Sequence, residues 1–185
     1  MNDSQVHEHR FRGGPERLRS AERVAMLEVE RVVALSLEDL VVKSMLDVGT
    51  GTGLFAEAFS KLVPEVTGID TNVDLLAVAY GYVPGAQFRE GAAEAIPFED
   101  GAFDLAFLGH VLHETDDVLK ALREARRVAR NRVVILEWPY RKEQQGPPLE
   151  HRLRPEAIED FADRAGFRKV ESLKIKHMAL YRLTP

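Results

Sequence analysis

The sequence lacks cysteine altogether. This absence excludes disulfides, thiolate metal sites and cysteine nucleophiles, and it is compatible with a reducing compartment. Long apolar runs are also missing, since none approaches the roughly 20 residues that a membrane-spanning helix needs. The N-terminal residues are polar and lack the apolar core of a signal peptide. We therefore expect a cytoplasmic protein without a membrane span.

An excess of basic residues is absent as well. The 185 residues include 25 Lys and Arg against 30 Asp and Glu, which gives a formal net charge of −5. General nucleic-acid binders usually present a basic face, so this charge argues against DNA as a partner and disfavours RNA. With 45% hydrophobic and 30% charged residues, the composition is that of an ordinary globular protein. The length favours one domain.

Residues 45–70 contain the most informative pattern in the chain. A short apolar run at 45–48 leads into Gly49, Gly51 and Gly53, and a second apolar run ends on Asp70. Alternating glycines allow a sharp bend and let a ligand approach the backbone, while the helix that follows directs free N–H groups towards the bend. An acid at the tip of the second strand can accept hydrogen bonds from ribose hydroxyls. The pattern predicts a site for a nucleotide-type ligand.

Strand and helix patterns alternate through the rest of the chain. Strands are expected at 44–48, 66–69, 86–90, 103–108 and 132–137, with a closing antiparallel hairpin at 167–175 and 178–183. Helices are expected at 18–35, 54–62, 73–80, about 115–129 and 155–166. This order predicts an α/β fold with a Rossmann-like, doubly wound, seven-stranded mixed sheet, mostly parallel and covered by helices on both faces. We expect a lid segment and helix over 1–43 and one structural domain over 44–185.

Four stretches carry a resemblance to a known family. They are 46–53 (LDVGTGTG), 68–70 (GID), 91–98 (GAAEAIPF), and 103–105 (FDL) running into 111–114 (VLHE). With them, residues 44–183 resemble a class I S-adenosylmethionine-dependent methyltransferase of the small-molecule branch that includes the ubiquinone and menaquinone biosynthesis enzymes. The resemblance implies an enzyme that transfers a methyl group from S-adenosyl-L-methionine to a small molecule and releases S-adenosyl-L-homocysteine.

The resemblance also implies roles for individual residues around the cofactor. Gly49, Gly51 and Gly53 would surround the methionine moiety. Asp47 would orient its amino group, and Asp70 would hold the ribose hydroxyls. The cofactor set implied by the family is completed by Thr50, Thr71, Ala92, Ala93, Glu94, Gly109 and His110.

Two parts of this set have specific expectations. Ala93 would offer backbone groups to the adenine, and Gly109 and His110 would flank the sulfonium. The family usually has an acid at the position of Ala92, where it accepts a hydrogen bond from the adenine amino group. Here Glu94, Glu90 or a water molecule would substitute for it, or the affinity for the cofactor would be lower.

The methyl group on a sulfonium is already activated, so catalysis requires mainly a nucleophile held in line and kept dry. A general base helps when the acceptor loses a proton. His110, His113 and Glu114 follow the fourth strand and Tyr140 follows the fifth, where ligands of open α/β sheets bind. We expect residues 7–11 to close over the pocket as a lid. The two histidines lack the spacing of a zinc-hydrolase pair, so no metal is expected.

Several alternatives remain open at this stage. Residues 51–56 also fit G-x-G-x-x-A, the pattern of an NAD(P)-dependent oxidoreductase, although no Tyr-x-x-x-Lys pair is present. A non-catalytic domain that binds S-adenosylmethionine is a further alternative. The oligomeric state, monomer or homodimer, is not determined by the sequence.

Two local features allow more than one interpretation. The segment 138–140 (WPY) either lines an aromatic acceptor pocket or covers the sheet edge. A basic cluster is expected to be solvated loop charge, with an acidic substrate group or RNA phosphate as the alternatives. It consists of Arg141, Lys142, His151, Arg152 and Arg154.

Overall fold

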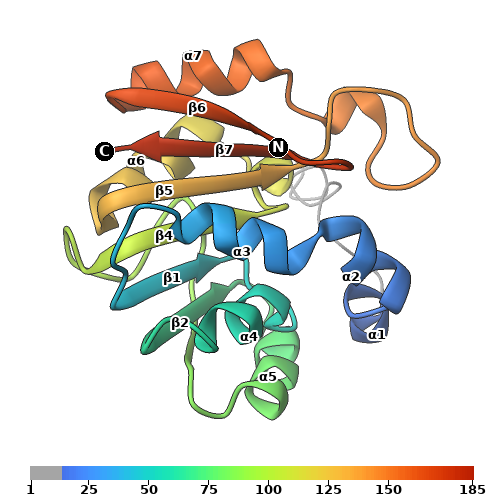
Figure 1. The fold of residues 1–185 in the computed structure, drawn as a ribbon, viewed down its shortest axis with the longest axis vertical. Coiled ribbons are helices and arrows are strands. Elements are labelled where there is room, and N and C mark those ends of the chain that lie inside the picture. The colour runs from blue at the N-terminus through green and yellow to red at the C-terminus, as the bar shows by residue number, and fades with distance from the viewer. Residues whose placement is uncertain (1–13) are drawn as a thin grey trace, which may run out of the picture.

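The computed structural model describes residues 14–185, which are built around one mixed sheet of seven strands (Figure 1). The strands are β1 (Ser44–Val48), β2 (Glu65–Asp70), β3 (Gln87–Glu90), β4 (Phe103–Gly109), β5 (Ala129–Glu137), β6 (Lys169–Lys174) and β7 (Ala179–Thr184). Their order is β3-β2-β1-β4-β5-β7-β6, with the first five parallel and β7 antiparallel to both β5 and β6. The predicted fold class is confirmed.

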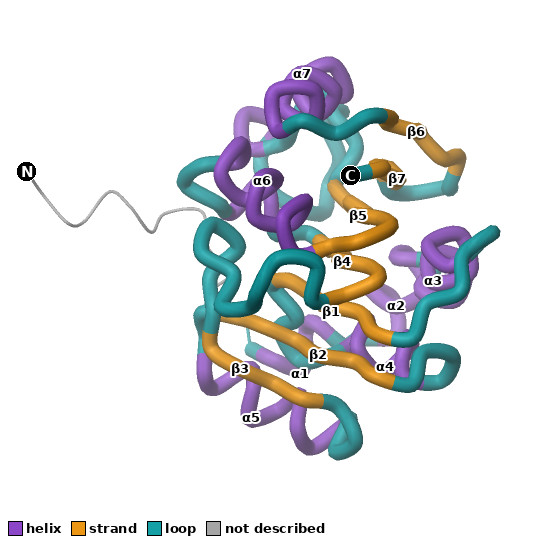
Figure 2. Tube along the Cα trace, turned by 90° about the vertical axis from the view of Figure 1, so that its left-hand side faces the viewer, coloured by secondary structure: helices purple, strands orange, loops and turns teal. Residues whose placement is uncertain are grey.

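Helices cover both faces of this sheet. The α-helices are α1 (Pro15–Leu18), α2 (Ala21–Leu27), α3 (Val29–Leu37), α4 (Leu54–Ser60), α5 (Val73–Tyr82), α6 (Val118–Val128) and α7 (Pro155–Ala165), and the short 3₁₀ helices are η1 (Leu112–Glu114) and η2 (Leu149–His151). Figure 2 shows α6 and α7 on one side of the sheet and α2, α3 and α4 on the other. Within residues 14–185, no helix combines the length and the apolar character that crossing a bilayer requires.

The central strand β4 explains why the sequence is nearly continuously apolar there. On one face, the Phe107 ring packs against Phe55 and Phe59 of α4, with ring centroids 4.6 and 5.3 Å apart. On the other face, Leu108 joins the cluster that contains Leu122 of α6. A parallel strand with both faces covered cannot alternate with polar residues. Its polar chemistry is therefore confined to its two ends, Asp104 at the start and the residues after Gly109.

The single helix expected over 18–35 is wrong, because the structure has three helices there. Ser20 caps α2 by accepting a hydrogen bond from the backbone N–H of Arg23. Glu28 then adopts a left-handed conformation (φ 48°) between α2 and α3. Its carboxylate accepts hydrogen bonds from the backbone N–H of Lys176, at 2.6 Å, and from Arg31. The apolar periodicity continues across both breaks and so conceals them.

Smaller differences concern the segment after β4. A 3₁₀ turn, η1, precedes α6, and the side chain of Asp117 caps α6 through the N–H of Lys120. Helix α6 therefore begins later than expected. Residues 7–11, expected to form a lid, lie outside the described part of the chain.

The expectation that the basic cluster is solvated is wrong for Arg152, which is buried. The guanidinium donates hydrogen bonds to four carbonyl oxygens and to one carboxylate, those of Pro139, Arg141, Gln145, Pro147 and Glu143. It also lies 5.3 Å from the centroid of the Trp138 ring. Arg152 thus holds the loop between β5 and α7 in one shape by satisfying carbonyls that have no partner in a strand or helix.

We expect Arg152→Ala to destabilise the protein by about 3 kcal/mol, because four backbone carbonyls and a carboxylate lose a charged donor together. Urea unfolding measures this loss, and limited proteolysis should show faster cleavage within residues 139–151. Arg154→Ala is the matched control, since Arg154 is exposed and only stacks over Tyr140. It should cost less than about 1 kcal/mol. Equal losses for the two variants would contradict the role assigned to Arg152.

Candidate functional site

The sheet has its topological switch point between β1 and β4, the position where open α/β folds bind ligands. A cleft of about 1480 Å³ lies at the carboxyl ends of the parallel strands. Its walls come from the turn after β1, the ends of β2 and β4, helices α1 and α2, and the loop that Arg152 holds. In Figure 1, the arrowheads of the parallel strands point towards this side of the molecule.

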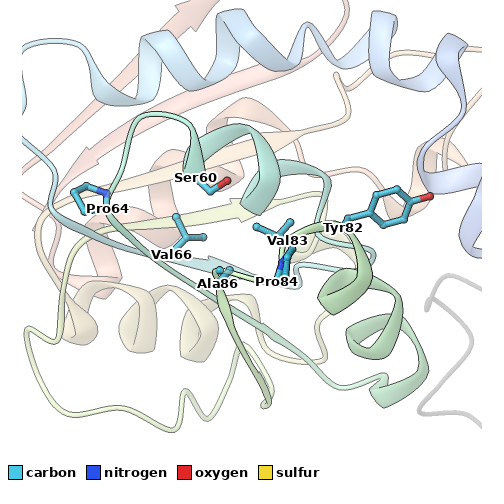
Figure 3. A pocket seen from close by; sticks show the side chains of 8 residues that line it. Ser60, Pro64, Val66, Tyr82, Val83, Pro84 and Ala86 are labelled. Carbon is cyan, nitrogen blue, oxygen red and sulfur yellow. The ribbon is translucent and has the colours of Figure 1, made fainter.

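A smaller pocket of about 350 Å³ lies elsewhere, near the start of β2 and the turn after α5 (Figure 3). Its walls are mainly apolar, from Pro64, Val66, Val83 and Ala86. The ring of Tyr82, which also lines it, is covered by the guanidinium of Arg19 at 3.5 Å. The pocket holds no acid, base or cluster of donors, so the large cleft is the candidate site.

The glycine turn after β1 has the conformation that its sequence predicts. Gly49, Gly51 and Gly53 have φ values of 68°, 55° and 75°, which other residues rarely adopt. A Cβ on Gly49 would lie 2.7 Å from a methyl group of Val111, whereas one on Gly51 would meet only Leu18 at 3.5 Å. Gly49 and Gly51 line the cleft.

Gly53 differs from the other two glycines. It is not among the residues that line the cleft. A Cβ there would lie 3.0 Å from the Cβ of Ala79, so Gly53 permits close packing of the turn on α5. The resemblance placed Gly53 in the cofactor set. In the structure Gly53 lies at a packing contact with α5 and does not line the cleft.

Asp70 and Thr71, at the end of β2, form the next part of the wall. The carboxylate of Asp70 accepts hydrogen bonds from the backbone N–H groups of Gly51 and Asn72, each at 2.8 Å. The acid at the end of β2 is thus fixed against the glycine turn after β1. This arrangement brings together the two features that the sequence pattern singled out.

Asp47, at the end of β1, is buried and also lines the cleft. Burial raises its pKa to about 7, and the charge of Asp70 adds to this, although hydrogen bonds from Thr50 and from the backbone of Ala56 oppose it. The Thr50 hydroxyl donates to Asp47 Oδ2 at 2.6 Å. A buried carboxyl group with such a pKa would be stabilised in its ionised form by a cation bound beside it.

The segment after β3 contributes Gly91, Ala93 and Glu94 to the cleft, whereas Ala92 does not line it. Ala92 forms an isolated backbone bridge with Ala95. The carboxylate of Glu94 accepts a hydrogen bond from the backbone N–H of Asp116 at 2.9 Å. Glu94 therefore borders the position where the family's usual acid is missing, with its carboxylate tethered to the loop before α6.

At the end of β4, Gly109 is followed by His110, which has a left-handed backbone (φ 58°). The imidazole is buried beside Trp138, with ring centroids 5.1 Å apart, and lines the cleft. Among the described residues, neither of its ring nitrogens has a hydrogen-bond partner. Burial lowers the pKa of His110 to about 3, against the opposing charge of Glu137, so the ring is neutral at physiological pH.

His113 lies in η1, and its Nδ1 is 2.8 Å from Oε2 of Glu137, the last residue of β5. Both side chains are almost fully buried, at 6% and 2% exposure. Burial lowers the pKa of His113, but the charges of Glu137 and Glu114 and the hydrogen bond outweigh it, so the pKa is raised. Burial raises the pKa of Glu137, and the pairing with His113 outweighs it, so that pKa is lowered.

The sequence analysis missed two residues of this region. Glu137 had an available signal, because it is an acid at the carboxyl end of a buried strand, as Asp70 is. No sequence signal pointed to Arg23, because only folding brings α2 to the cleft. Its charge lowers the pKa of both His110 and His113.

Tyr140 does not join the other candidates. It does not line the cleft, and the guanidinium of Arg154 lies 4.6 Å from its ring centroid. Trp138 lines the cleft and is itself almost fully covered. Within residues 14–185, no group of three His, Asp or Glu side chains is placed to hold a metal ion.

Comparison with known proteins agrees with this geometry. Residues 46–136 match a family described as a methyltransferase domain. An uncharacterized methyltransferase of Bacillus subtilis, YcgJ, is 38% identical over 89 residues, which is 45% of this chain and 35% of the relative. A demethylmenaquinone methyltransferase of Thermotoga maritima is 36% identical over 112 residues, 58% of this chain and 48% of that protein. The chain thus spans less than half the length of these curated relatives.

Solved structures share the fold. A SAM-dependent methyltransferase from Aquifex aeolicus superposes with a TM-score of 0.81 at 23% identity, over 94% of this chain and 99% of that one. A phosphoethanolamine N-methyltransferase of Haemonchus contortus in complex with S-adenosyl-L-methionine has a TM-score of 0.67 at 21% identity, over 80% of this chain and 38% of that one. Residues 46–136 therefore match the methyltransferase-domain family in sequence, and the described residues share the fold of solved S-adenosylmethionine-dependent methyltransferases.

Proposed function

We propose that the protein binds S-adenosyl-L-methionine in the cleft and transfers its methyl group to a small-molecule acceptor. The observation that supports this most directly is the Asp70 carboxylate held at 2.8 Å from the N–H of Gly51, at the switch point of the sheet. It combines a ribose-binding acid with a turn whose backbone a ligand can approach. A structural turn alone would not require a large cleft beside it.

The residues of the cleft fit the proposed cofactor from one end to the other. Asp47 is a buried acid that a ligand ammonium would compensate, and Thr50 positions its carboxyl group. Asp70 and Thr71 lie where ribose hydroxyls would be held, and Ala93 with Glu94 where the adenine would lie. Gly109 and His110 would then face the sulfonium end. Bound there, the cofactor supplies a methyl group that needs no further activation.

The acceptor end of the cleft is formed by His110, His113 and residues of α2. We propose His113, with its raised pKa, as the general base and His110 as a neutral hydrogen-bonding group. The demethylmenaquinone methyltransferase of Thermotoga maritima is matched over only 48% of its own length, so its substrate is not assigned to this chain. A cytoplasmic location and the choice between monomer and homodimer stay predictions.

Asp70→Ala should weaken binding of both S-adenosylmethionine and S-adenosylhomocysteine by about tenfold to a hundredfold, because the ribose hydroxyls lose a charged acceptor. Titration calorimetry measures this. Asp74→Ala is the matched control, because Asp74 is an exposed acid in the first turn of α5, and this variant should bind like the parent. NAD(H) should not bind to either protein. Tighter binding of NAD(H) than of the methyl donor would establish the oxidoreductase alternative instead.

Asp47→Asn should change how stability depends on pH. A carboxyl group whose pKa is raised in the folded state stabilises the fold below its unfolded value and loses this contribution as the pH rises through the folded value, here about 7. Between about pH 5 and pH 7, the parent should therefore lose about 2 kcal/mol relative to the Asn variant, which cannot ionise. Urea unfolding at a series of pH values measures the difference.

The same titration tests the ligand contact of Asp47. Saturating S-adenosylhomocysteine should move the midpoint of this pH dependence to lower pH in the parent, because its ammonium favours the ionised carboxylate. Asp74→Asn serves as the control for a change of net charge. Parallel stability curves for the parent and Asp47→Asn would show that the buried carboxyl group does not titrate as proposed.

A further inference from the structure

The acceptor end of the cleft contains a group of ionisable side chains that cofactor binding does not use. Arg23 of α2 and His113 and Glu114 of η1 line the cleft, and Glu137 at the end of β5 lies against His113. His110 lies beside them and is neutral. The group therefore has one fixed positive charge, two carboxylates and one imidazole whose protonation can change.

The guanidinium of Arg23 is the least satisfied member of the group. Among residues 14–185, none accepts a hydrogen bond from it, although the charge of Glu114 attracts it. Burial lowers the pKa of Arg23, which shows that water has been partly removed from around the charge. A guanidinium has five donors, and a partly buried one is stabilised when an anion or an oxygen occupies them.

His113 and Glu137 have the geometry of an oriented base. Because Glu137 Oε2 lies 2.8 Å from Nδ1, the Nδ1 atom carries the proton and Nε2 is left as the accepting nitrogen. The backbone N–H of His113 also donates to Glu137 Oε1, at 3.3 Å, which fixes the carboxylate. Nε2 lies 3.7 Å from an oxygen of Glu114, on the side of the cleft.

The neutral ring of His110 supplies the second independent observation. It is about nine-tenths buried, it lines the cleft, and both of its nitrogens lack partners among the described residues. Buried polar atoms are almost always satisfied, so this ring has a donor and an acceptor available for a ligand. Oxygen accepts such hydrogen bonds well, whereas sulfur accepts them weakly.

We propose that the methyl acceptor is a small molecule with a weakly acidic hydroxyl group of the phenol or enol type, bound between Arg23, His110 and the His113–Glu137 pair. The proposal rests on the function proposed above. A carboxylate acceptor would need no base, and a protonated amine has no lone pair to accept a hydrogen bond from Arg23. A hydroxyl group that must lose its proton uses both the base and the cation.

The proposed transfer forms an oxygen–carbon bond and breaks a carbon–sulfur bond. The acceptor oxygen gives its proton to Nε2 of His113 and uses the freed electron pair to bond the methyl carbon. The bond between that carbon and the sulfonium breaks with its pair on sulfur, which leaves a thioether, a methyl ether and an imidazolium. Arg23 stabilises the oxyanion before transfer, and Glu137 stabilises the imidazolium. Glu137 acts only through His113 and is a positioning residue.

A coloured hydroxyl compound tests this site without turnover. In para-nitrophenol the phenolate absorbs visible light and the phenol does not, so the spectrum reports ionisation of the bound probe. With S-adenosylhomocysteine present, the bound probe should ionise about one pH unit lower than in free solution, because an opposite charge nearby favours the anion. Arg23→Met should abolish this shift. Arg17→Met, an exposed cation that lines the same cleft, is the matched control and should retain it.

The base is tested by a second pair of measurements. His113→Gln should reduce the shift of the probe. Glu137→Gln should lower the pKa of the His113 ring measured by NMR, whereas Glu137→Asp, which keeps the charge, should restore part of it. The groups facing His113 that set this titration are Arg23, Glu114, Glu137 and the neutral His110. If Glu137→Gln left both the ring titration and the probe spectrum unchanged, the positioning role would be wrong.

The outcomes separate this inference from the proposed function. If the cofactor binds and the bound probe ionises as in solution, ionises equally in Arg23→Met, or fails to bind, the hydroxyl assignment is overturned. Tighter binding of para-nitrobenzylamine than of para-nitrophenol at neutral pH would overturn it in favour of an amine. If S-adenosylhomocysteine fails to bind, the proposed function fails. The probe titrated without cofactor then still decides whether Arg23 holds an oxyanion.

Discussion

A parallel strand that helices cover on both faces can place polar side chains only where it ends. In this protein three of the parallel strands carry a buried or half-buried acid as their last or next-to-last residue, Asp47 on β1, Asp70 on β2 and Glu137 on β5. Burying a carboxylate is costly unless it is protonated, hydrogen-bonded or paired with a cation. The cleft depends on how the fold meets this cost at each strand.

Each acid meets the cost in a different way. Asp70 accepts two backbone N–H groups and so remains an acceptor fixed in space. Glu137 is paired with His113, which lowers the pKa of the acid and raises that of the imidazole. Asp47 has a hydroxyl and a backbone N–H as partners but no cation among residues 14–185, and its pKa rises to about 7. Asp70 is thus a rigid hydrogen-bond acceptor, Glu137 orients the imidazole of His113, and Asp47 is an acid that a ligand cation would ionise.

The sequence could predict the first of these sites because its determinants are local. The pattern lies within 26 residues and consists of alternate glycines, an apolar strand on each side and an acid at a strand tip. Its recognition therefore needs no knowledge of contacts between distant parts of the chain. The mostly parallel mixed sheet follows from the alternation of strands and helices, and the closing hairpin from the two strand patterns that come last in the chain. The pairing of His113 with Glu137 does not, because these residues are 24 positions apart and meet only when β4 and β5 lie side by side. Arg23 and Arg152 depend on contacts that no periodicity encodes.

The wall that bears Arg23 is attached to the core by few side chains. Helix α1 buries none of its residues and α2 only Leu27, so apolar packing supplies little of their stability. Arg19, between them, replaces that packing with three polar contacts. It pairs with Glu57 of α4 at 2.7 Å, donates to the carbonyl of Thr52 at 3.2 Å and stacks on Tyr82 of α5. Since Thr52 belongs to the glycine turn, the wall that bears Arg23 is positioned through the same turn that Asp70 fixes. The geometry of the two ends of the cleft is therefore coupled through residues 49–53.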